Sequence, residues 1–342
     1  MRQESLLLAL ALSALTATGC DDGGGEGERV DAGPDAGKDG GLDATTADAA
    51  AAADSALGQK VTIRFKAKMG AQDLVCGQTY PNVGSSLVSA EVQDFRLFVQ
   101  EVRLINGKGQ EVPLLLEERG AQQSKEVALL DFTDGTGACT SGAATTNMII
   151  TGHVPADTYN GIVFVNGVSE SLNHGNPALA PEPLKAPGAH WDWKLGYRFT
   201  MAELLPVASH QLDGGAHDGG AQGGAHGSDA GGGDGGAPSH GGGGEGAVFV
   251  HTGSTACNGV PGGDGGVSCS KANRAEIRFT SFNPATQSIV ADLAAVFSEV
   301  DLSQGTQCHG SGESCRSGYS ALGVDLTTGA PSPATQKVYR VE

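Results

Sequence analysis

The sequence predicts an all-β protein, a β-sandwich of short antiparallel strands with long irregular loops and disulfides. Three observations lead to this fold class. Short apolar runs, several of them alternating with polar residues, are separated by frequent turn residues. No long segment repeats its apolar residues with the period of a helix. An even set of cysteines follows an N-terminal export signal, as in disulfide-bonded exported domains.

The strands are predicted in order along residues 60–342. Residues 60–67 alternate cleanly, with Val61, Ile63 and Phe65 on one side and polar side chains on the other. Residues 95–99 repeat this pattern, and residues 102–104 run into a turn signal, Asn106-Gly107-Lys108-Gly109. Further short apolar runs occupy residues 112–116, 127–132, 148–154, 159–165, 248–250, 275–282 and 288–291, and residues 292–300 predict one short helix.

Residues 1–19 have the features of a lipoprotein signal peptide. The apolar run from Leu6 to Leu15 is too short to span a bilayer as a helix. It ends in Ala17-Thr18-Gly19-Cys20, where small residues precede a cysteine. We therefore expect Cys20 to be lipidated and to anchor an extracytoplasmic protein to a membrane. We expect this to be the outer membrane, with the protein facing the periplasm or the cell surface. The alternative is a plain secretory signal followed by an unmodified cysteine.

Residues 20–59 consist mainly of Gly, Ala and Asp, with almost no apolar surface to bury. Such a segment cannot offset its own ordering entropy, so we expect a disordered tether. Much of the formal net charge of −18 lies here and in a second low-complexity stretch. The acidic composition argues against nucleic acid as a partner, because nucleic-acid binding needs a basic face.

The second low-complexity stretch, at about residues 212–247, interrupts the predicted domain of residues 60–342. It contains no aromatic or β-branched residue and is too long for an ordinary connection. We expect a disordered His/Gly-rich insertion, because strand-like residues 248–250 follow it directly. Its histidines lead to two hypotheses, a soluble spacer or a weak metal buffer. They are His210, His217, His226 and His240, in or beside the insertion.

Six of the seven cysteines lie in the predicted domain, at positions 76, 139, 257, 269, 308 and 315. An even number in an exported chain implies disulfides, for which several connectivities are possible. Proximity in the sequence favours Cys257 with Cys269 and Cys308 with Cys315, which leaves Cys76 with Cys139. The competing hypothesis is a thiolate metal site, and no Cys-x-x-Cys spacing supports it.

The motifs of self-contained catalytic machinery are missing from the sequence. There is no Gly-x-Ser-x-Gly, phosphate-binding loop, dinucleotide fingerprint or His-Glu-x-x-His. Both tryptophans, Trp191 and Trp193, instead lie together, and in an extended strand they would point to the same face. The spacing alone favours a strand with a bulky core face as the explanation of this pair. Nearby histidines in a chain without carboxylate clusters favour a metal that prefers imidazole, copper or zinc; they are His174, His190 and His251.

A set of short motifs runs through the chain in a fixed order. They are Asp94-Phe95-Arg96-Leu97-Phe98-Val99, Ala128-Leu129-Leu130-Asp131-Phe132, Tyr159-Asn160-Gly161, Leu172-Asn173-His174, Trp191-x-Trp193, Gly196-Tyr197-Arg198-Phe199, His251-Thr252-Gly253-Ser254-Thr255-x-Cys257, the pair Cys308 and Cys315, and Leu322-Gly323-Val324-Asp325. In this ordered set, which covers nearly everything from Val61 onward, the chain resembles the MbnP-like family. Its members are extracytoplasmic copper-binding proteins associated with methanobactin operons.

The resemblance implies a function and a partner. In relatives, one tryptophan is oxidised to kynurenine by a dihaem enzyme of the bacterial cytochrome c peroxidase/MauG-like class, and the kynurenine and two histidines hold Cu(I). Carried over by motif, Trp191 and Trp193 are the candidates for modification. His174 and His251 are the candidate copper ligands, with His190 as an alternate. The chain would then be a substrate of a modifying oxidase and not itself an enzyme.

Two other functions remain open at the level of the sequence. The chain could be a non-metal β-sandwich lipoprotein with a binding or structural role, in which the tryptophan pair is core or a stacking surface. It could also buffer metal only through the His-rich insertion.

Overall fold

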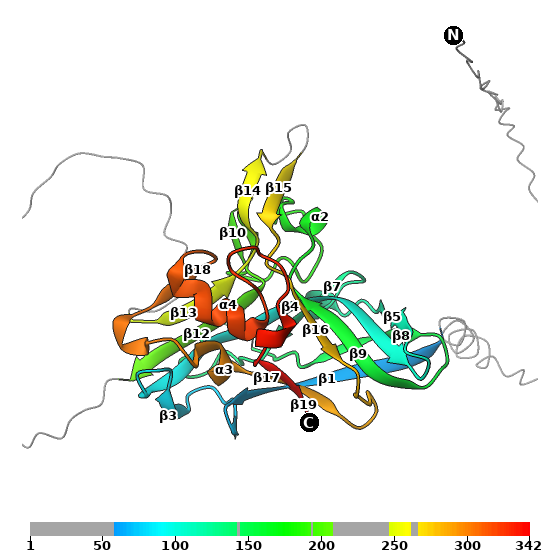
Figure 1. Cartoon of the computed structure of the whole chain (residues 1–342), viewed down its shortest axis with the longest axis horizontal. Helices are drawn as coiled ribbons and strands as arrows, with labels where there is room; N and C mark the ends of the chain where they lie inside the picture. Colours follow the sequence, from blue (N-terminus) through cyan, green and yellow to red (C-terminus); the bar gives the residue numbers. More distant parts are fainter. Residues whose placement is uncertain (1–57, 142–143, 193, 208–245, 261–265) are drawn as a thin grey trace, which may run out of the picture. The chain divides into compact units, whose positions relative to one another are not determined.

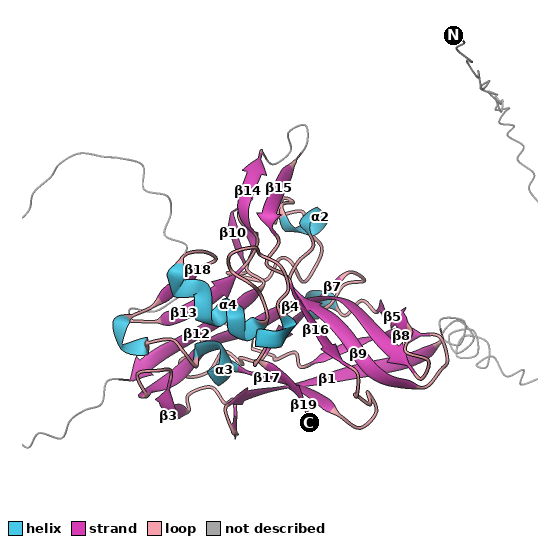
Figure 2. Ribbon diagram, in the orientation of Figure 1, coloured by secondary structure: helices cyan, strands magenta, loops and turns pink. Residues whose placement is uncertain are grey.

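The structure, a computed structural model, describes residues 58–141, 144–192, 194–207, 246–260 and 266–342. The predicted signal peptide, Cys20, nearly all of the predicted tether and insertion, and Trp193 lie outside the described residues. The described part is mostly strands arranged in two large sheets and two small hairpins, which confirms the all-β fold class (Figure 2). None of the helices found in that part is long and apolar enough to cross a membrane.

The six-stranded sheet, the smaller of the two large sheets, is built around β1 (Gln59–Met69). The alternation of apolar and polar residues along β1 is plain in the sequence. Ile63 and Phe65 are buried while Arg64 between them is exposed, as expected for a sheet with one solvent face. β17 pairs with β1 in parallel and β8 pairs with it antiparallel. The strand order is β19 (Tyr339–Val341), β17 (Ser288–Asp292), β1, β8 (Ile149–Val154) and β6 (Leu115–Leu116), with β2 (Gln72–Asp73) at the end of β1.

The nine-stranded sheet is organised around one long strand, β4 (Val88–Asn106). Along its main path the order is β16 (Ala275–Phe279), β9 (Tyr159–Asn166), β4, β12 (Thr200–Val207), β13 (Val248–Thr252) and β18 (Gln307–His309). Three further strands pair with β4, namely β3 (Thr79–Val83), β5 (Glu111–Pro113) and β7 (Val127–Asp131). The edge strand β18 pairs with β13 in parallel. The sequence predicted antiparallel strands and did not indicate this parallel pair.

The sequence divides β4 into two short segments, at 95–99 and 102–104, whereas the structure joins them. The join is a bulge, where Glu101 has a φ of 51° and the register with β9 shifts between Gln100 and Arg103. The bulge interrupts the alternation of side chains, and for this reason the sequence pattern breaks although the strand continues. β12 pairs with residues 89–97 and β9 with residues 99–106, so one strand aligns both neighbours.

Small elements complete the fold. The two hairpins are β10 (His190–Asp192) with β11 (Gly196–Tyr197), and β14 (Thr255–Gly259) with β15 (Val267–Lys271). The helices are α2 (Glu170–Asn173), α3 (Leu293–Phe297) and α4 (Arg316–Leu322), with short 3₁₀ turns at Gly120–Gln122, Leu302–Gln304, Glu313–Cys315 and Pro333–Thr335. The helix predicted within 292–300 is confirmed as α3, where the Asp292 side chain accepts a hydrogen bond from the amide of Ala294.

Two apolar cores lie on opposite faces of the nine-stranded sheet. The main core fills the space between the two large sheets, where Phe164 of β9 makes edge contacts with Phe65 of β1 and Tyr339 of β19. The second core is smaller and joins the sheet residues Phe98 and Met201 to the segment of residues 168–199. That segment, which holds the tryptophan motif, therefore forms a cover over the far face of the sheet (Figure 1).

The three disulfides confirm the two pairs favoured by proximity in the sequence and the third pair that these two left over. Cys76 bonds to Cys139, Cys257 to Cys269, and Cys308 to Cys315. The first and third place sulfur in the main core, because Cys139, Cys308 and Cys315 are fully buried. The second crosses the β14–β15 hairpin between directly opposite residues.

Replacing Phe164 by alanine tests the packing of the two large sheets. The ring is 0% exposed, and its edge contacts with Phe65 and Tyr339 have centroid separations of 5.8 and 5.4 Å. We expect Phe164→Ala to lower the free energy of unfolding by about 3–5 kcal/mol, because it removes buried apolar surface and leaves a cavity in the core. Denaturant unfolding measures this. Leu115→Ala, at a strand residue that is 58% exposed, should change it by less than about 0.5 kcal/mol.

Candidate metal centre

A row of polar side chains crosses the far face of the nine-stranded sheet, beneath the cover of residues 168–199. Residues directly opposite in register point to the same face of a sheet. Arg96 lies opposite Asp131 and Met201, Asp94 lies opposite Glu203, Met201 lies opposite His251, and His251 lies opposite His309. The row therefore runs through β7, β4, β12, β13 and β18 and consists of Asp131, Arg96, Asp94, Glu203, His251 and His309.

Arg96 and Asp94 form a buried ion pair in the middle of this row. Their side chains are 3% and 1% exposed, and Arg96 donates from Nε to Asp94 Oδ1 at 2.8 Å and from Nη2 to Oδ2 at 2.5 Å. A planar, bidentate pair of this kind offsets the cost of removing two charges from water. Arg96 Nη1 also donates to the carbonyl oxygen of Pro187 at 2.8 Å. This bond ties the cover to the sheet just before the tryptophan motif.

His251 and Glu203 form the second buried pair of the row. Each side chain is 1% exposed, and His251 Nε2 lies 2.7 Å from Glu203 Oε1. Burial raises the pKa of Glu203 from 4.5 to about 7, and burial lowers the pKa of His251 well below 6.5. The imidazole of His251 is therefore neutral, which is the state in which histidine binds a metal. It stacks on Phe249, with ring centroids 4.5 Å apart and an angle of 18°.

The second ring nitrogen of His251 is the notable polar atom of this pair. His251 Nδ1 is buried and has no hydrogen-bond partner among the described residues. A buried polar atom left without a partner is costly and rare in native structures. When Nε2 donates its proton to Glu203, Nδ1 keeps its lone pair and is able to accept a proton or bind a metal.

Trp191 packs against the ends of β13 and β18. A Cβ atom placed on Gly253 would lie 2.5 Å from Cζ3 of Trp191, and one placed on Gly310 would lie 3.1 Å from Cη2. Gly253 follows His251 by two residues, and Gly310 follows His309 directly. The indole is half-buried, Arg198 lies 5.8 Å from its ring centroid, and Nε1 is buried with no partner among the described residues. Trp191 and His251 are therefore brought to the same region.

The tryptophan motif forms a hairpin, not one continuous strand. His190 pairs with Tyr197, the two rings meet edge to face at 4.9 Å, and Asp192 caps the turn by accepting from the amides of Lys194 and Leu195. Asp192 turns the chain back because its carboxylate satisfies two amides that a strand would pair elsewhere. His190 is half-buried beside Trp191, whereas Trp193 lies outside the described residues.

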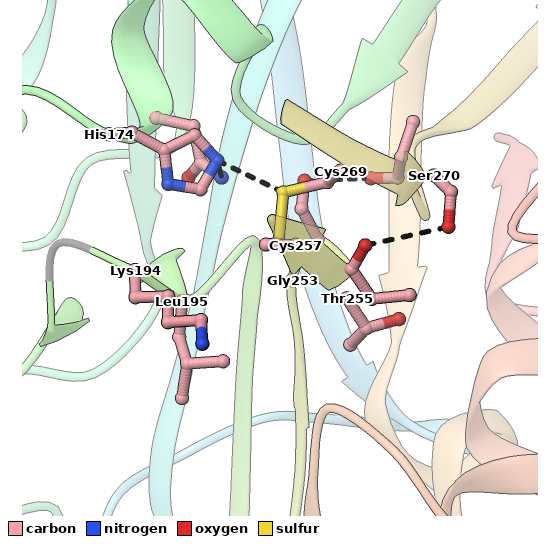
Figure 3. The surroundings of a disulfide bond; sticks show 12 residues. His174, Lys194, Leu195, Gly253, Thr255, Cys257, Cys269 and Ser270 are labelled. Carbon is pink, nitrogen blue, oxygen red and sulfur yellow. Dashed lines mark hydrogen bonds between the residues drawn. A yellow bond between two sulfur atoms is a disulfide. The ribbon is translucent and has the colours of Figure 1, made fainter. Parts of the chain in front are cut away.

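His174 occupies a different setting, at the end of α2 beside the β14–β15 hairpin (Figure 3). Its Nε2 lies 3.1 Å from Cys269 Sγ of the disulfide and 3.2 Å from Asn173 Nδ2. Asn173 in turn accepts the amide of Tyr197 at 2.8 Å, which joins α2 to the tryptophan hairpin. The structure thus places His174 against the sulfur of a disulfide and His251 against the carboxylate of Glu203.

Of the six members of this row, the sequence pointed only to His251 as a site residue, and it gave no indication that Glu203 and His309 lie beside it. His309 is an exposed residue on the edge strand β18, with its ring 6.1 Å from that of His251 and 4.5 Å from that of Phe249. The only signal in the sequence was its position next to Cys308, which indicates a disulfide and nothing about His251. Glu203 lies in an otherwise apolar strand, and a lone acid in such a run is the signal that could have identified it.

Adding a methyl group at Gly253 tests the contact with Trp191. The new Cβ would also lie 2.7 Å from the carbonyl oxygen of Tyr197, so neither neighbour can yield easily. We expect Gly253→Ala to lower stability by about 1–3 kcal/mol and to shift the fluorescence of Trp191, measured in a Trp193→Phe background. Gly107→Ala is the matched control, because nothing lies within 4 Å of its added Cβ. An unchanged spectrum for Gly253→Ala would contradict the packing described here.

The pKa of Glu203 predicts a pH-dependent stability in the metal-free protein. Glutamate ionises near 4.5 when unfolded and near 7 here, so the folded state retains a proton between these values. Glu203 should therefore contribute a fall in stability as pH rises from about 4.5 to about 7, against the opposite contribution of His251, whose lowered pKa makes stability rise as pH approaches 6.5. Glu203→Gln should remove this fall, as measured by urea unfolding at a series of pH values. A parallel pH dependence in the two proteins would show that Glu203 is not the group responsible.

Comparisons with known proteins address the same region. The sequence profile of the MbnP family matches residues 58–310. Among solved structures, the chain is similar to MbnP from Methylosinus trichosporium, with a TM-score of 0.64 and 27% sequence identity, over 83% of this chain and 98% of that one. Comparison with curated proteins gave no match. The family match covers most of the described residues, including the tryptophan hairpin and the row of polar side chains, and the chain belongs to the MbnP family.

Proposed function

We propose that this protein is an extracytoplasmic lipoprotein that binds copper as Cu(I) through histidines and a tryptophan oxidised to kynurenine. Membership of the MbnP family supports a copper-related role. The observation that carries the proposal is the buried Nδ1 of the neutral His251 imidazole, which has no hydrogen-bond partner among the described residues and lies two residues from Gly253, the glycine against which Trp191 packs. Cu(I) is a soft ion that accepts imidazole and tolerates few ligands.

The residues present suit such an ion. His251 would bind through Nδ1 while Glu203 holds Nε2, the arrangement in which an outer carboxylate sets the orientation and tautomer of a metal-binding histidine. The second imidazole would be His174, at the end of α2, or its alternate His190, the first residue of the tryptophan hairpin, and His309 is a further candidate beside His251.

Trp191 and Trp193 are the candidates for oxidation. An intact indole offers only an N–H donor, whereas ring opening exposes an aromatic amine and a ketone that are able to ligate. Trp191 is half-buried and packs next to Gly253, two residues from His251, so a ligand formed there would need little movement. The oxidant would come from a partner dihaem enzyme of the cytochrome c peroxidase/MauG-like class, for which this chain is a substrate.

The anchoring of the protein follows from its N-terminus. Lipidation of Cys20 would attach the tether to a membrane, the outer membrane, with the β domain facing the periplasm or the surface. Three disulfides suit this oxidising location. Labelling of the N-terminal peptide with a fatty acid, detected by mass spectrometry, tests the lipid.

Mass spectrometry and metal analysis of protein purified from its native host test the copper proposal. We expect about one copper per chain and the tryptophan-to-kynurenine mass shift in the peptide that contains Trp191 and Trp193. His251→Asn should remove the copper because it deletes the Nδ1 ligand. His153→Asn is the matched control, since His153 is also buried and faces a glutamate, Glu117, but on β8 of the other sheet.

Other outcomes would favour the competing functions. Copper that disappears when residues 212–247 are deleted, and survives His251→Asn, would assign binding to the His-rich insertion. Two intact tryptophans together with no copper would leave a non-metal binding or structural lipoprotein, in which the tryptophan motif serves packing.

A further inference from the structure

The β14–β15 hairpin carries the disulfide that is most accessible of the three. Cys257 and Cys269 are half-buried and directly opposite each other, whereas Cys139, Cys308 and Cys315 are fully buried. The hairpin forms its own two-stranded sheet and projects from the rest of the fold (Figure 1). A reductant could therefore reach this bond without opening either core.

An imidazole is already aimed at this disulfide. His174 Nε2 lies 3.1 Å from Cys269 Sγ, and Figure 3 shows the ring turned toward the two sulfurs. The nitrogen and both sulfurs lie within 4.8 Å of one another. His174 is held there through Asn173, whose Oδ1 accepts the amide of Tyr197 and whose side chain packs on Gly196. These three atoms have the chemistry and spacing of ligands for one soft metal ion.

We propose that the Cys257–Cys269 disulfide is redox-active and that its reduction creates a second metal site, Cys257–Cys269–His174, for Cu(I). A dithiol reductant would attack Cys257 Sγ and release Cys269 as a thiolate beside His174. Its second thiol would then release Cys257, so that two electrons and two protons pass to the cysteines and the reductant becomes a disulfide. Binding of Cu(I) would displace both thiol protons to solvent.

The surrounding contacts keep the sulfurs close after the bond is broken. The hairpin pairs in register from Thr255 with Lys271 to Gly259 with Val267, which holds the two cysteines opposite each other. At its base, Asn273 Nδ2 donates to the carbonyl of Gly253 at 2.7 Å and to Thr255 Oγ1 at 3.0 Å.

Cu(I) suits this site because two thiolates and one imidazole form a soft set of few ligands. The site differs from the proposed centre at His251, which uses no sulfur and exists in the oxidised protein; that centre would then take His190 or His309 as its second imidazole, because His174 serves the sulfur site. Oxidised protein would hold copper at His251 alone, whereas reduced protein would hold one ion more. The hairpin would thereby couple copper capacity to the thiol redox state around the protein.

Titration of the full mature chain with Cu(I), against a chromophoric Cu(I) chelator, tests the proposal. Protein is compared before and after treatment with a dithiol, which is removed under anaerobic conditions. We expect reduced protein to bind about one more Cu(I) than oxidised protein, with near-ultraviolet thiolate-to-copper absorption. Alkylation and mass spectrometry should find Cys257 and Cys269 reduced first. Cys257→Ser/Cys269→Ser should abolish the additional ion and leave the copper of the oxidised protein unchanged.

His174→Ala should weaken the additional site at least about tenfold, since it removes one of three ligands. Glu170→Ala, an exposed change on the same short helix, should not. No additional copper after reduction, or equal gains in the double cysteine variant, would overturn the second site. Wild-type affinity in His174→Ala would overturn its ligand set. A gain on reduction in protein that binds no copper when oxidised would support this site while the proposal for His251 fails.

Discussion

The buried ion pair between Arg96 and Asp94 is the constraint on which the candidate site depends. Both charges are removed from water on the far face of the nine-stranded sheet, where only bidentate pairing makes them tolerable. Arg96 uses its remaining nitrogen to hold the carbonyl of Pro187. The cover segment is thereby fixed just before His190 and Trp191, so an electrostatic requirement inside the sheet sets the position of the tryptophan motif above it.

The same burial controls the chemistry of the neighbouring pair. Glu203 and His251 sit side by side in the sheet, and the lack of solvent keeps the imidazole neutral. Nε2 of this neutral imidazole is bound to Glu203, and Nδ1 has no partner among the described residues. Such an imidazole is suited to binding a soft cation. Because positions 253 and 310 are glycines, the indole of Trp191 can approach β13 and β18, the strands that carry His251 and His309. Ion pair, imidazole and close glycine contacts thus form one arrangement.

His174 and His251, the two candidate copper ligands identified by motif, differ in how firmly the fold holds them. His251 belongs to β13, which is paired on both sides, and is 1% exposed, so its geometry is set by the surrounding packing. His174 lies at the end of a one-turn helix and contacts a hairpin that is packed into neither core. A site at His251 is accordingly rigid and permanent, whereas one at His174 depends on the covalent state of the adjacent cysteines. The two positions suit different tasks within one copper-related protein.

The sequence by itself determined the local features. The alternation at 60–67 indicates β1, Asp292 before an apolar run indicates α3, and close spacing identifies two disulfides, because each signal depends on near neighbours. The ordered motifs also identified the family. Only the tertiary structure decided that 95–99 and 102–104 are one strand, since a bulge at Glu101 hides its continuity. It alone placed Glu203 and His309 beside His251, and His174 against a disulfide, because pairing between strands far apart in the chain leaves no local pattern.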